Sequence, residues 1–407
     1  MLFKTKYFTY NCLIKGLYIS LLFSAFIYLE YFDISNTLFN SFLALMAIYT
    51  FLTTPRASLF WAGFFTAILW FWWIGISFIH YDLTYLIPFV LLGIGLIYGT
   101  LFTLSSLYSK LWIRALLLFL LSFISPFGFN WFKPELFFIN SYFQSSKFAF
   151  ALIIVCLSLF IFYAKSRYKL LTLLPLVFAI NTQTPKLQLP PLTISMPQYN
   201  IEQDDKWNQT LKKDIIALNI ARINHAIKEN YDMVVLPETA FPMLLNTSPQ
   251  LMQELKLLSQ DIAIVTGAMH MDKEQYHNST YFFKQGDVQI ANKVVLVPFG
   301  EAVPFPDFIR DFINNSFYNG AQDYSTADHA SDFEFNGIKF RNAICYETTT
   351  DKIYEKTPPY VLSLSNNAWF TPSTEPTLQK LLMKYYARKY NVTIFAIANK
   401  SKNQIIY

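Results

Sequence analysis

Charged residues are distributed very unevenly along this chain of 407 residues, and this constrains the fold more than any other feature. Only 15 of the first 180 residues are Asp, Glu, Lys or Arg, whereas 44 of the remaining 227 are. An ordinary globular domain has roughly 25% charged residues, so the first part is too apolar to fold alone in water. We therefore predict a membrane region followed by a domain exposed to water.

Seven stretches of the first part have the composition of a membrane-crossing helix, which needs about 20 apolar residues. The third and fourth are free of charge over 57–79 and 84–108. The seventh is the weakest, because Pro175 lies inside its uninterrupted apolar run. The predicted spans are 11–29, 36–53, 57–79, 84–108, 111–128, 147–164 and 168–181.

The charges between these spans predict an orientation, because Lys and Arg favour the cytoplasmic side. With the N-terminus inside, nine basic residues are cytoplasmic: Lys4, Lys6, Lys15, Arg56, Lys110, Arg114, Lys165, Arg167 and Lys169. The external loops carry only two, with four acids: Lys133, Lys147, Glu30, Asp33, Asp82 and Glu135. An odd number of spans then places the rest of the chain outside the cytoplasm. We expect the first span to stay uncleaved, since no small-residue cleavage site follows it.

Three tryptophans, Trp70, Trp72 and Trp73, stand close together in the third span. Trp is enriched where a span meets the membrane surface, so the sequence favours an interfacial aromatic belt. A lipid-facing substrate groove is the functional alternative.

The second part has alternating helix and strand patterns after a polar, proline-rich linker. We predict helices at 209–229 and 378–390, and strands at 233–236, 262–266, 281–283, 288–291, 338–346, 360–365 and 392–398. This order favours a layered α/β domain. The predicted organisation is a membrane domain over 1–181, a linker over 182–192 and an α/β domain over 193–407.

Polar residues follow three of the predicted strands. Glu238 follows the first, Cys345 and Glu347 end the second, and Asn367 follows the third. Because ligand sites of α/β sheets gather at the carboxyl ends of strands, we expect these four residues to be neighbours.

Cys345 is the most informative of these, since Cys12 and Cys156 lie in predicted spans and leave it no disulfide partner in the outer domain. Its thiol is either a nucleophile or a buried inert side chain. No HExxH, CxxC, P-loop, GxGxxG or GxSxG occurs, so we expect no metal or organic cofactor. The net charge of +5 without a basic cluster argues against a nucleic-acid partner.

A nucleophilic thiol needs a base or a nearby cation. Glu238 could accept its proton, and Lys293 could stabilise an oxyanion from what reads as an apolar strand over 292–301. A solvated lysine at a strand end is the alternative for Lys293. A Cys-His pair stays open, because nothing in the sequence selects one histidine.

The residues at these positions resemble a known family. Leu236-Pro237-Glu238, Lys293 and Ile344-Cys345-Tyr346-Glu347 match the Glu-Lys-Cys pattern of the nitrilase (carbon-nitrogen hydrolase) superfamily. The segments Val297-Pro298-Phe299-Gly300-Glu301 and Asn367-Ala368-Trp369-Phe370, behind a multi-span region, resemble the bacterial apolipoprotein N-acyltransferases. The resemblance covers nearly the whole chain.

The resemblance implies an α-β-β-α sandwich and an acyl transfer in two steps. Cys345 would take an acyl group from a phospholipid, with Glu238 as base and Lys293 at the oxyanion. The diacylglyceryl-cysteine of an apolipoprotein would then accept that group on its α-amino nitrogen. Supporting acids would be Glu301 and Glu347. Gln198 and the pair Lys206-Trp207 would lie near the active-site mouth, and substrate contacts would include Trp207, Trp369 and Phe370.

The family likeness also implies a multi-pass protein of the bacterial inner membrane, with its catalytic domain on the periplasmic side. A lid facing lipid could come from Phe305, Phe308, Phe312, Phe317 and Tyr318. The family usually adds a membrane helix after the catalytic domain, and the residues after 398 show no such apolar run. Two other functions stay open: a membrane-anchored amidase that transfers acyl groups to water, and a transporter or receptor with a non-catalytic binding domain.

Overall fold

The structure is a computed structural model that describes residues 9–182, 186–317, 320 and 323–407. Contacts between Cα atoms divide it into two compact units. Unit 1 comprises Met1–Pro126, Asn130–Thr184 and Pro372–Tyr385, and unit 2 comprises Phe127–Phe129, Pro185–Thr371 and Tyr386–Tyr407. The expected linker over 182–192 lies partly outside the described residues.

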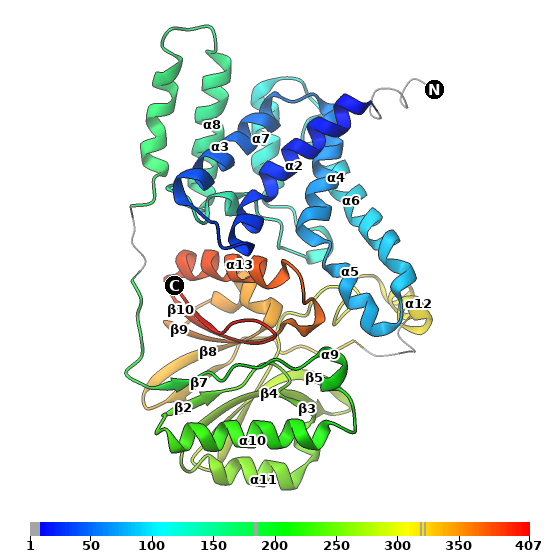
Figure 1. Ribbon diagram of the computed structural model, residues 1–407, viewed down its shortest axis with the longest axis vertical. Coiled ribbons are helices and arrows are strands. Elements are labelled where there is room, and N and C mark those ends of the chain that lie inside the picture. Colours follow the sequence, from blue (N-terminus) through cyan, green and yellow to red (C-terminus); the bar gives the residue numbers. More distant parts are fainter. Residues whose placement is uncertain (1–8, 183–185, 318–319, 321–322) are drawn as a thin grey trace. The chain divides into compact units, whose positions relative to one another are not determined.

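Unit 1 is built of apolar helices (Figure 1). They are α2 (Tyr10–Tyr31), α3 (Thr37–Thr53), α4 (Arg56–Phe71), α5 (Ile74–Ser77), α6 (Ile87–Leu104), α7 (Leu111–Leu121), α8 (Lys147–Phe162) and the 3-10 segment η5 (Lys169–Ala179). All seven positions expected to be spans are therefore helical.

Three of these helical stretches are long and apolar enough to cross a membrane: Tyr10–Tyr31, Thr84–Leu104 and Leu111–Gly128. A fourth crossing is possible if Arg56–Phe71 and Ile74–Tyr81, which are bent by 50°, form one broken span. The remaining apolar helices at the expected positions are shorter, so the number of seven crossings stays a prediction.

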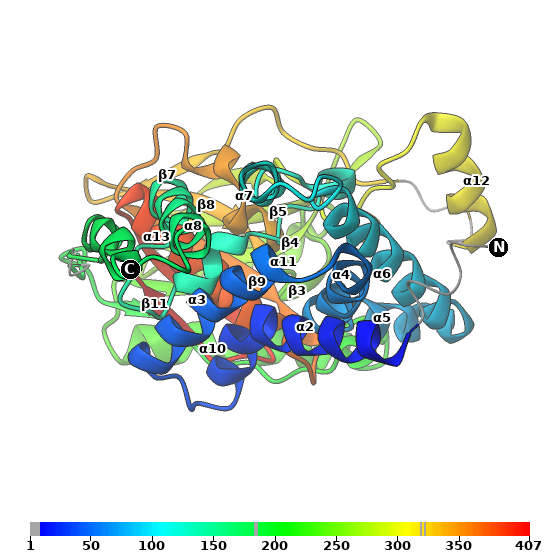
Figure 2. The same cartoon turned by 90° about the horizontal axis from the view of Figure 1, so that it is seen from above.

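Glycines set the close packing of α4 against α6, which run side by side (Figures 1 and 2). A Cβ on Gly63 would lie 2.3 Å from the carbonyl oxygen of Tyr98. On α6, a Cβ on Gly95 would lie 2.6 Å from the Phe64 ring, and Gly99 is four residues further along the same helix face. This GxxxG spacing is typical of helix pairs within membranes.

Trp70 and Trp73 do not form an interfacial belt. They are 0% and 2% exposed, and the indole N–H of Trp70 donates to the carbonyl of Phe23 on α2. The Trp70 ring also meets the Phe26 ring edge-on, with their centroids 5.2 Å apart. The belt prediction is therefore wrong for these two residues, because helix-helix packing buries them inside unit 1.

Polar groups at one end of unit 1 interact with each other. Lys147 pairs with the fully buried Glu135 at 2.8 Å, and Asn140 donates to Glu30 at 2.8 Å. Lys380 of α13 (Glu375–Tyr390) pairs with Glu30 at 2.7 Å. The charge pattern predicts that the chain segments around residues 30, 135 and 147 lie on the same side of the membrane. These contacts make the three segments neighbours.

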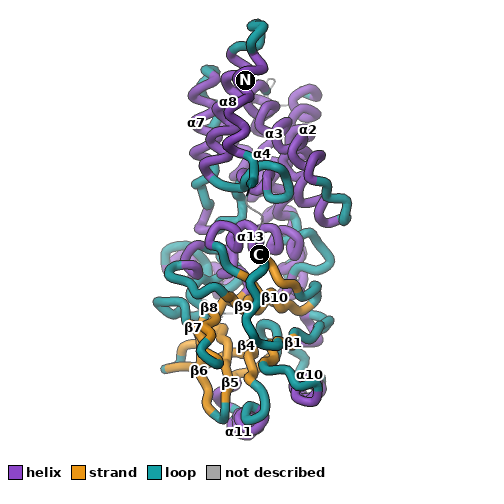
Figure 3. Tube along the Cα trace, turned by 90° about the vertical axis from the view of Figure 1, so that its left-hand side faces the viewer, coloured by secondary structure: helices purple, strands orange, loops and turns teal. Residues whose placement is uncertain are grey.

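Unit 2 contains two β-sheets, whose strands are orange in Figure 3. The first has the order β1-β2-β4-β5-β6 with β3 beside β4, and the second has the order β11-β10-β9-β8-β7. Their bounds are β1 (Ile194–Ser195), β2 (Met233–Val235), β3 (Phe241–Leu244), β4 (Ala263–Asp272), β5 (Gln275–Lys284), β6 (Asp287–Asn292), β7 (Asp332–Phe335), β8 (Ile338–Ile344), β9 (Tyr360–Asn366), β10 (Thr393–Asn399) and β11 (Gln404–Ile406). Strands β1, β2 and β4 run parallel to one another in the first sheet, and β8, β9 and β10 do so in the second.

Two apolar cores explain the layers of unit 2. Val234 and Leu236 face a core shared with α10 (Lys212–Lys228) and α11 (Pro249–Leu258), the helices at the base of Figure 3. The alternate residue Val235 faces a second core, which contains Leu362 and Phe395 of the other sheet. Because successive strand residues point to opposite faces, β2 is buried on both sides. The predicted layered α/β class is confirmed.

One predicted strand does not form, and another ends earlier than expected. β6 ends at Asn292, so the predicted strand over 292–301 is wrong. The reason is that the N–H groups of Val294 and Val295 both bind the carboxylate of Glu347 instead of a neighbouring strand. β8 ends at Ile344, because Cys345 adopts a positive φ of 53°.

Candidate active site

Glu238 lies two residues after Leu236, at the carboxyl end of β2, and is 8% exposed. The backbone turns sharply there, since the next residue, Thr239, has a φ of 45°. Gly267 of β4 passes directly against this turn. A Cβ on Gly267 would lie 2.4 Å from the nitrogen of Thr239 and 2.7 Å from the Cα of Glu238. Only glycine fits there, so the β2–β4 pair fixes the position of Glu238.

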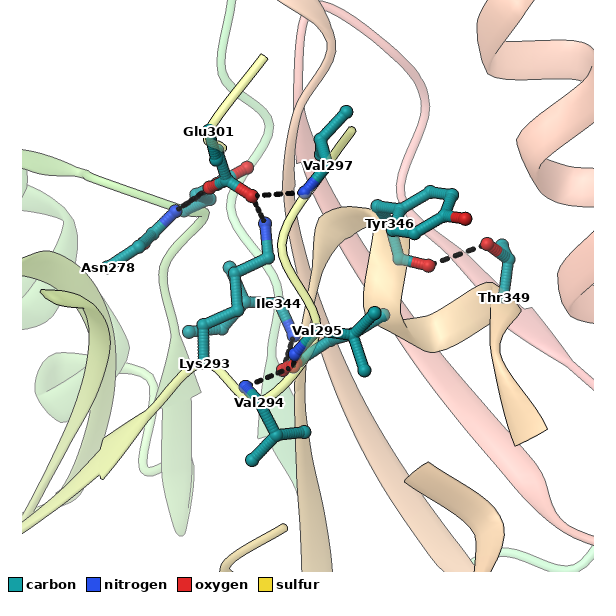
Figure 4. Close-up of polar contacts among 11 residues, drawn as sticks. Asn278, Lys293, Val294, Val295, Val297, Glu301, Ile344, Tyr346 and Thr349 are labelled. Carbon is teal, nitrogen blue, oxygen red and sulfur yellow. Dashed lines mark hydrogen bonds and ion pairs between the residues drawn. The ribbon is translucent and has the colours of Figure 1, made fainter. Parts of the chain in front are cut away.

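Lys293 follows β6 and is completely buried. Its Nζ forms an ion pair of 2.7 Å with Oε2 of Glu301, which also accepts a hydrogen bond of 2.9 Å from the N–H of Val297 (Figure 4). Burial by itself lowers the pKa of Lys293. The nearby negative charges of Glu301, Glu238, Cys345 and Glu347 outweigh burial and raise that pKa, so Lys293 is held in its charged form.

Asn278 of β5 connects the two acids on either side of Lys293. Its Nδ2 donates to Oε1 of Glu238 at 2.7 Å. It also donates to Oε1 of Glu301 at 3.0 Å (Figure 4). The side chain is 3% exposed. Sequence reasoning missed Asn278, whose only signal is a polar run just before the apolar part of its strand. A single amide thus connects Glu238 to Glu301, the partner of Lys293.

Cys345 begins the 3-10 segment η7 (Cys345–Thr349) directly after β8, and it is half-buried. Its left-handed backbone is uncommon for a residue with a side chain and typically marks a functional position. A negative charge on Cys345 would raise the pKa of Lys293. Among the described residues, none of the three cysteines forms a disulfide.

Glu347 is held by three backbone N–H groups and is 1% exposed. Oε1 accepts from Ile344 at 2.7 Å, and Oε2 accepts from Val294 at 2.8 Å and Val295 at 3.2 Å. Burial raises the pKa of Glu347 to about 7, and the charge of Lys293 together with these N–H groups opposes the rise. Glu347 therefore joins the end of β8 to the segment after Lys293, which is a structural role.

The other expected site residues have more exposed positions. Trp207 follows α9 (Gln203–Lys206) and is 41% exposed, while Trp369 and Phe370 are half-buried at the end of β9. Their contact with substrate stays a prediction. The Nδ2 of Asn367 donates to Oγ of Ser401 at 2.9 Å, so this side chain is engaged with the turn after β10.

Residues from the N-terminal part of the chain contact Tyr346, which directly follows Cys345. The Tyr346 hydroxyl donates to the carbonyl of Gly128 at 3.2 Å, and its ring stacks on Phe129 with a centroid distance of 5.7 Å. Gly128 and Phe129 come from the N-terminal part of the chain but belong to unit 2. The sequence did not predict that 127–129 would belong to unit 2, because nothing in these residues or their neighbours along the chain indicates it.

α12 (Asp307–Phe317) follows the segment of Glu301 and exposes two aromatic side chains on one face. Phe308 is 75% exposed and Phe312 is 67% exposed, four residues apart. Two of the five residues expected in a lipid-facing lid thus lie on one exposed helix face, while Tyr318 lies outside the described residues.

Comparisons with known proteins identify relatives over the whole chain. Residues 10–182 match the family model described as apolipoprotein N-acyltransferase integral membrane domain. The apolipoprotein N-acyltransferase of Wolinella succinogenes is 46% identical over 96% of this chain and 95% of its own length. That of Campylobacter jejuni is 39% identical over 97% of this chain and 89% of its own length.

Among solved structures, a carbon-nitrogen hydrolase superfamily protein from Xanthomonas campestris is 15% identical and has a TM-score of 0.39. The match covers 53% of this chain and 79% of that protein.

The family of this chain is assigned from the full-length relatives. Both the membrane domain model and relatives matching along nearly the entire sequence agree, so the chain belongs to the apolipoprotein N-acyltransferase family.

Proposed function

We propose that this protein transfers a fatty acyl group from a membrane phospholipid to the α-amino group of a diacylated apolipoprotein, through a thioester on Cys345. The observation that carries the proposal is the network around the buried Lys293: its ammonium pairs with Glu301, and Asn278 donates to both Glu301 and Glu238. A base after β2, a cation after β6 and a thiol after β8 are the three groups that an acyl transfer through cysteine requires.

In the first step, Sγ of Cys345 attacks the ester carbonyl of the phospholipid. Glu238 accepts the thiol proton, and Lys293 stabilises the negative oxygen of the tetrahedral intermediate. The C–O bond breaks, and the proton on Glu238 passes to the leaving lysophospholipid oxygen. The acyl group then remains on Cys345 as a thioester.

In the second step, the amine of the acceptor attacks the thioester carbonyl. A C–N bond forms, the C–S bond breaks, and Glu238 moves a proton from the amine to the departing sulfur. Asn278 and Glu301 support both steps by fixing the carboxylate of Glu238 and the ammonium of Lys293. The reaction needs no metal or organic cofactor.

The location follows the family and the charge pattern. We place unit 1 in the inner membrane of a bacterium and the catalytic residues on the periplasmic side, where the acceptor lipoprotein would be found. The exposed Phe308 and Phe312 of α12 suit contact with acyl chains, which would also limit water access to the thioester.

The intact mass of the purified full-length protein, measured after incubation with one defined phospholipid and no acceptor, tests this function. We expect a mass increase of one acyl group on Cys345 that hydroxylamine removes. Adding a diacylated lipopeptide with a free N-terminus should discharge the adduct and give a triacylated peptide. Free fatty acid without an adduct would instead favour the hydrolase, and neither product from folded protein would favour a binding protein.

A further inference from the structure

A second lysine is buried beside the candidate active site, and the mechanism above gives it no role. Lys206 is the last residue of α9 and is only 2% exposed. Its Nζ donates a hydrogen bond of 2.8 Å to the main-chain carbonyl of Glu238. That carbonyl belongs to the sharp turn which precedes the positive φ of Thr239. Lys206 therefore contacts the backbone that carries the proposed base.

A neutral carbonyl does not compensate a buried ammonium, since burying a charge is costly unless an opposite charge is near. Glu238 and Cys345 supply that opposite charge. Burial lowers the pKa of Lys206 to about 7, and the negative charges of Glu238 and Cys345 limit this fall. The coupling is reciprocal: if ionised Cys345 favours the charged form of Lys206, then charged Lys206 favours ionised Cys345 to the same extent.

The short helix that carries Lys206 is anchored by other bonds. Oε1 of Gln203 accepts from Asn366 at 2.8 Å, and Oδ1 of Asn366 accepts from Asn399 at 2.9 Å. Asn399 in turn binds the N–H of Ile201 at 2.9 Å and its carbonyl at 2.8 Å. Because this chain of amides holds 201–203 to the carboxyl ends of β9 and β10, the position of α9 does not depend on Lys206 alone.

The two lysines have different partners. Lys293 is committed to Glu301 through an ion pair of 2.7 Å, while Lys206 has no carboxylate among its described hydrogen bonds and faces the Glu238 turn. When a proton moves from Cys345 to Glu238, the negative charge moves from the carboxylate to the sulfur. Lys206 interacts with both groups, so its positive charge is balanced before and after that transfer.

We propose that Lys206 is a positioning residue that fixes the turn of Glu238 and, through its positive charge, stabilises the thiolate of Cys345 during acylation. This inference rests on the proposed function and adds a second cation to it. It requires that the charge of Lys206, and not only its hydrogen bond, affects the reactivity of the sulfur.

Alkylation of Cys345 by iodoacetamide separates these two contributions, since only the thiolate reacts. Cys12 and Cys156 are first replaced by Ala, so that Cys345 is the sole thiol. At pH 6 we expect alkylation to be about tenfold slower in both Lys206→Gln and Lys206→Met, the loss that corresponds to one unit in the ionisation of the thiol. Lys206→Arg keeps the charge and should stay within about threefold of the parent protein. At pH 10 all variants should react alike, which shows that access to the sulfur is unchanged.

Lys213→Gln is the matched control, because Lys213 is an exposed lysine on α10. Unchanged pH 6 rates in folded Lys206→Gln and Lys206→Met would overturn the proposal. A normal rate in Lys206→Gln with a slow rate in Lys206→Met would also overturn it, since anchoring alone would then explain the effect. If both neutral variants fail to fold, Lys206→Arg decides, and a tenfold loss at pH 6 in folded Lys206→Arg overturns the charge role. Failure of the proposed function is distinguished from failure of this inference by a different result: the unsubstituted protein would form no acyl adduct.

Discussion

Asn278 donates a hydrogen bond of 2.7 Å to the carboxylate of Glu238, and this bond connects the proposed base to β5. The same Nδ2 reaches Glu301 at 3.0 Å. An amide can serve two carboxylates at once because it offers two N–H donors, which neither Asp nor Ala can do.

Replacing Asn278 should therefore slow acylation of Cys345. We expect a loss of about tenfold or more for Asn278→Ala, and a larger loss for Asn278→Asp, which places a third carboxylate beside two others. Single-turnover acylation followed by intact mass measures the rate. Asn246→Ala, at an exposed position of the 3-10 segment η6 (Leu245–Thr247), is the control and should act like the unsubstituted protein. Equal rates in Asn278→Asp and the parent would remove Asn278 from the site.

The three cysteines should differ completely in their effect on activity. Cys345→Ala should abolish both the acyl adduct and the triacylated product, whereas Cys12→Ala and Cys156→Ala, which change thiols of the membrane helices, should retain them. Full activity of Cys345→Ala would rule out the thioester mechanism.

The proposed base and cation should each matter strongly. Glu238→Gln and Lys293→Met should lower the acylation rate by about a hundredfold or more, the loss typical of a general base or an oxyanion donor. The rate is compared in proteins with unchanged circular dichroism. Near-normal acylation by a folded variant would exclude that residue from the proposed role.

Gly267→Ala should impair activity without touching a polar group. The added methyl would lie 2.7 Å from the Cα of Glu238, so the turn must move and the carboxylate with it. We expect at least a tenfold loss in acylation rate and a lower melting temperature. Gly93→Ala is the control, because a Cβ there meets no atom within 4 Å. Wild-type activity in Gly267→Ala would mean that the position of Glu238 tolerates this shift.

The pKa of Glu347, raised from 4.5 to about 7, predicts a specific dependence of stability on pH. Between pH 4.5 and 7 the folded state binds the proton more tightly than the unfolded state. The stabilising contribution of protonated Glu347 is complete below about pH 4.5 and is lost as the pH rises through about 7.

Glu347→Gln removes this titration, so the melting temperature of the parent minus that of Glu347→Gln should decrease between pH 4.5 and 7. Glu334→Gln, at an exposed position of β7, controls for the loss of a carboxylate. A difference that stays constant or increases over this range would contradict the raised pKa of Glu347.

Much of the architecture could be predicted from the sequence because it depends on local pattern. The low charge of the first part and its apolar runs place helices at all seven expected positions, and alternating patterns locate β2, β8, β9 and β10 nearly to the residue. Glu238 and Cys345 could be singled out because polar residues at the carboxyl ends of buried strands are conspicuous. Each of these inferences requires only neighbouring residues.

The remaining features depend on contacts between distant segments, which no local pattern encodes. The residues after Lys293 leave the strand conformation because Glu347, more than fifty residues away in the chain, binds their N–H groups. Trp70 is buried because α2 covers it. Asn278 is identified only by the acid that it contacts. The resemblance places Lys206 near the active-site mouth, but only the structure shows its bond to the turn of Glu238. The sequence by itself determined the apolar helices, the alternation of helices and strands along the α/β domain, and the chemical groups. The tertiary structure decided the order of strands in each sheet and which buried charges face each other, because both depend on distance in space and not along the chain.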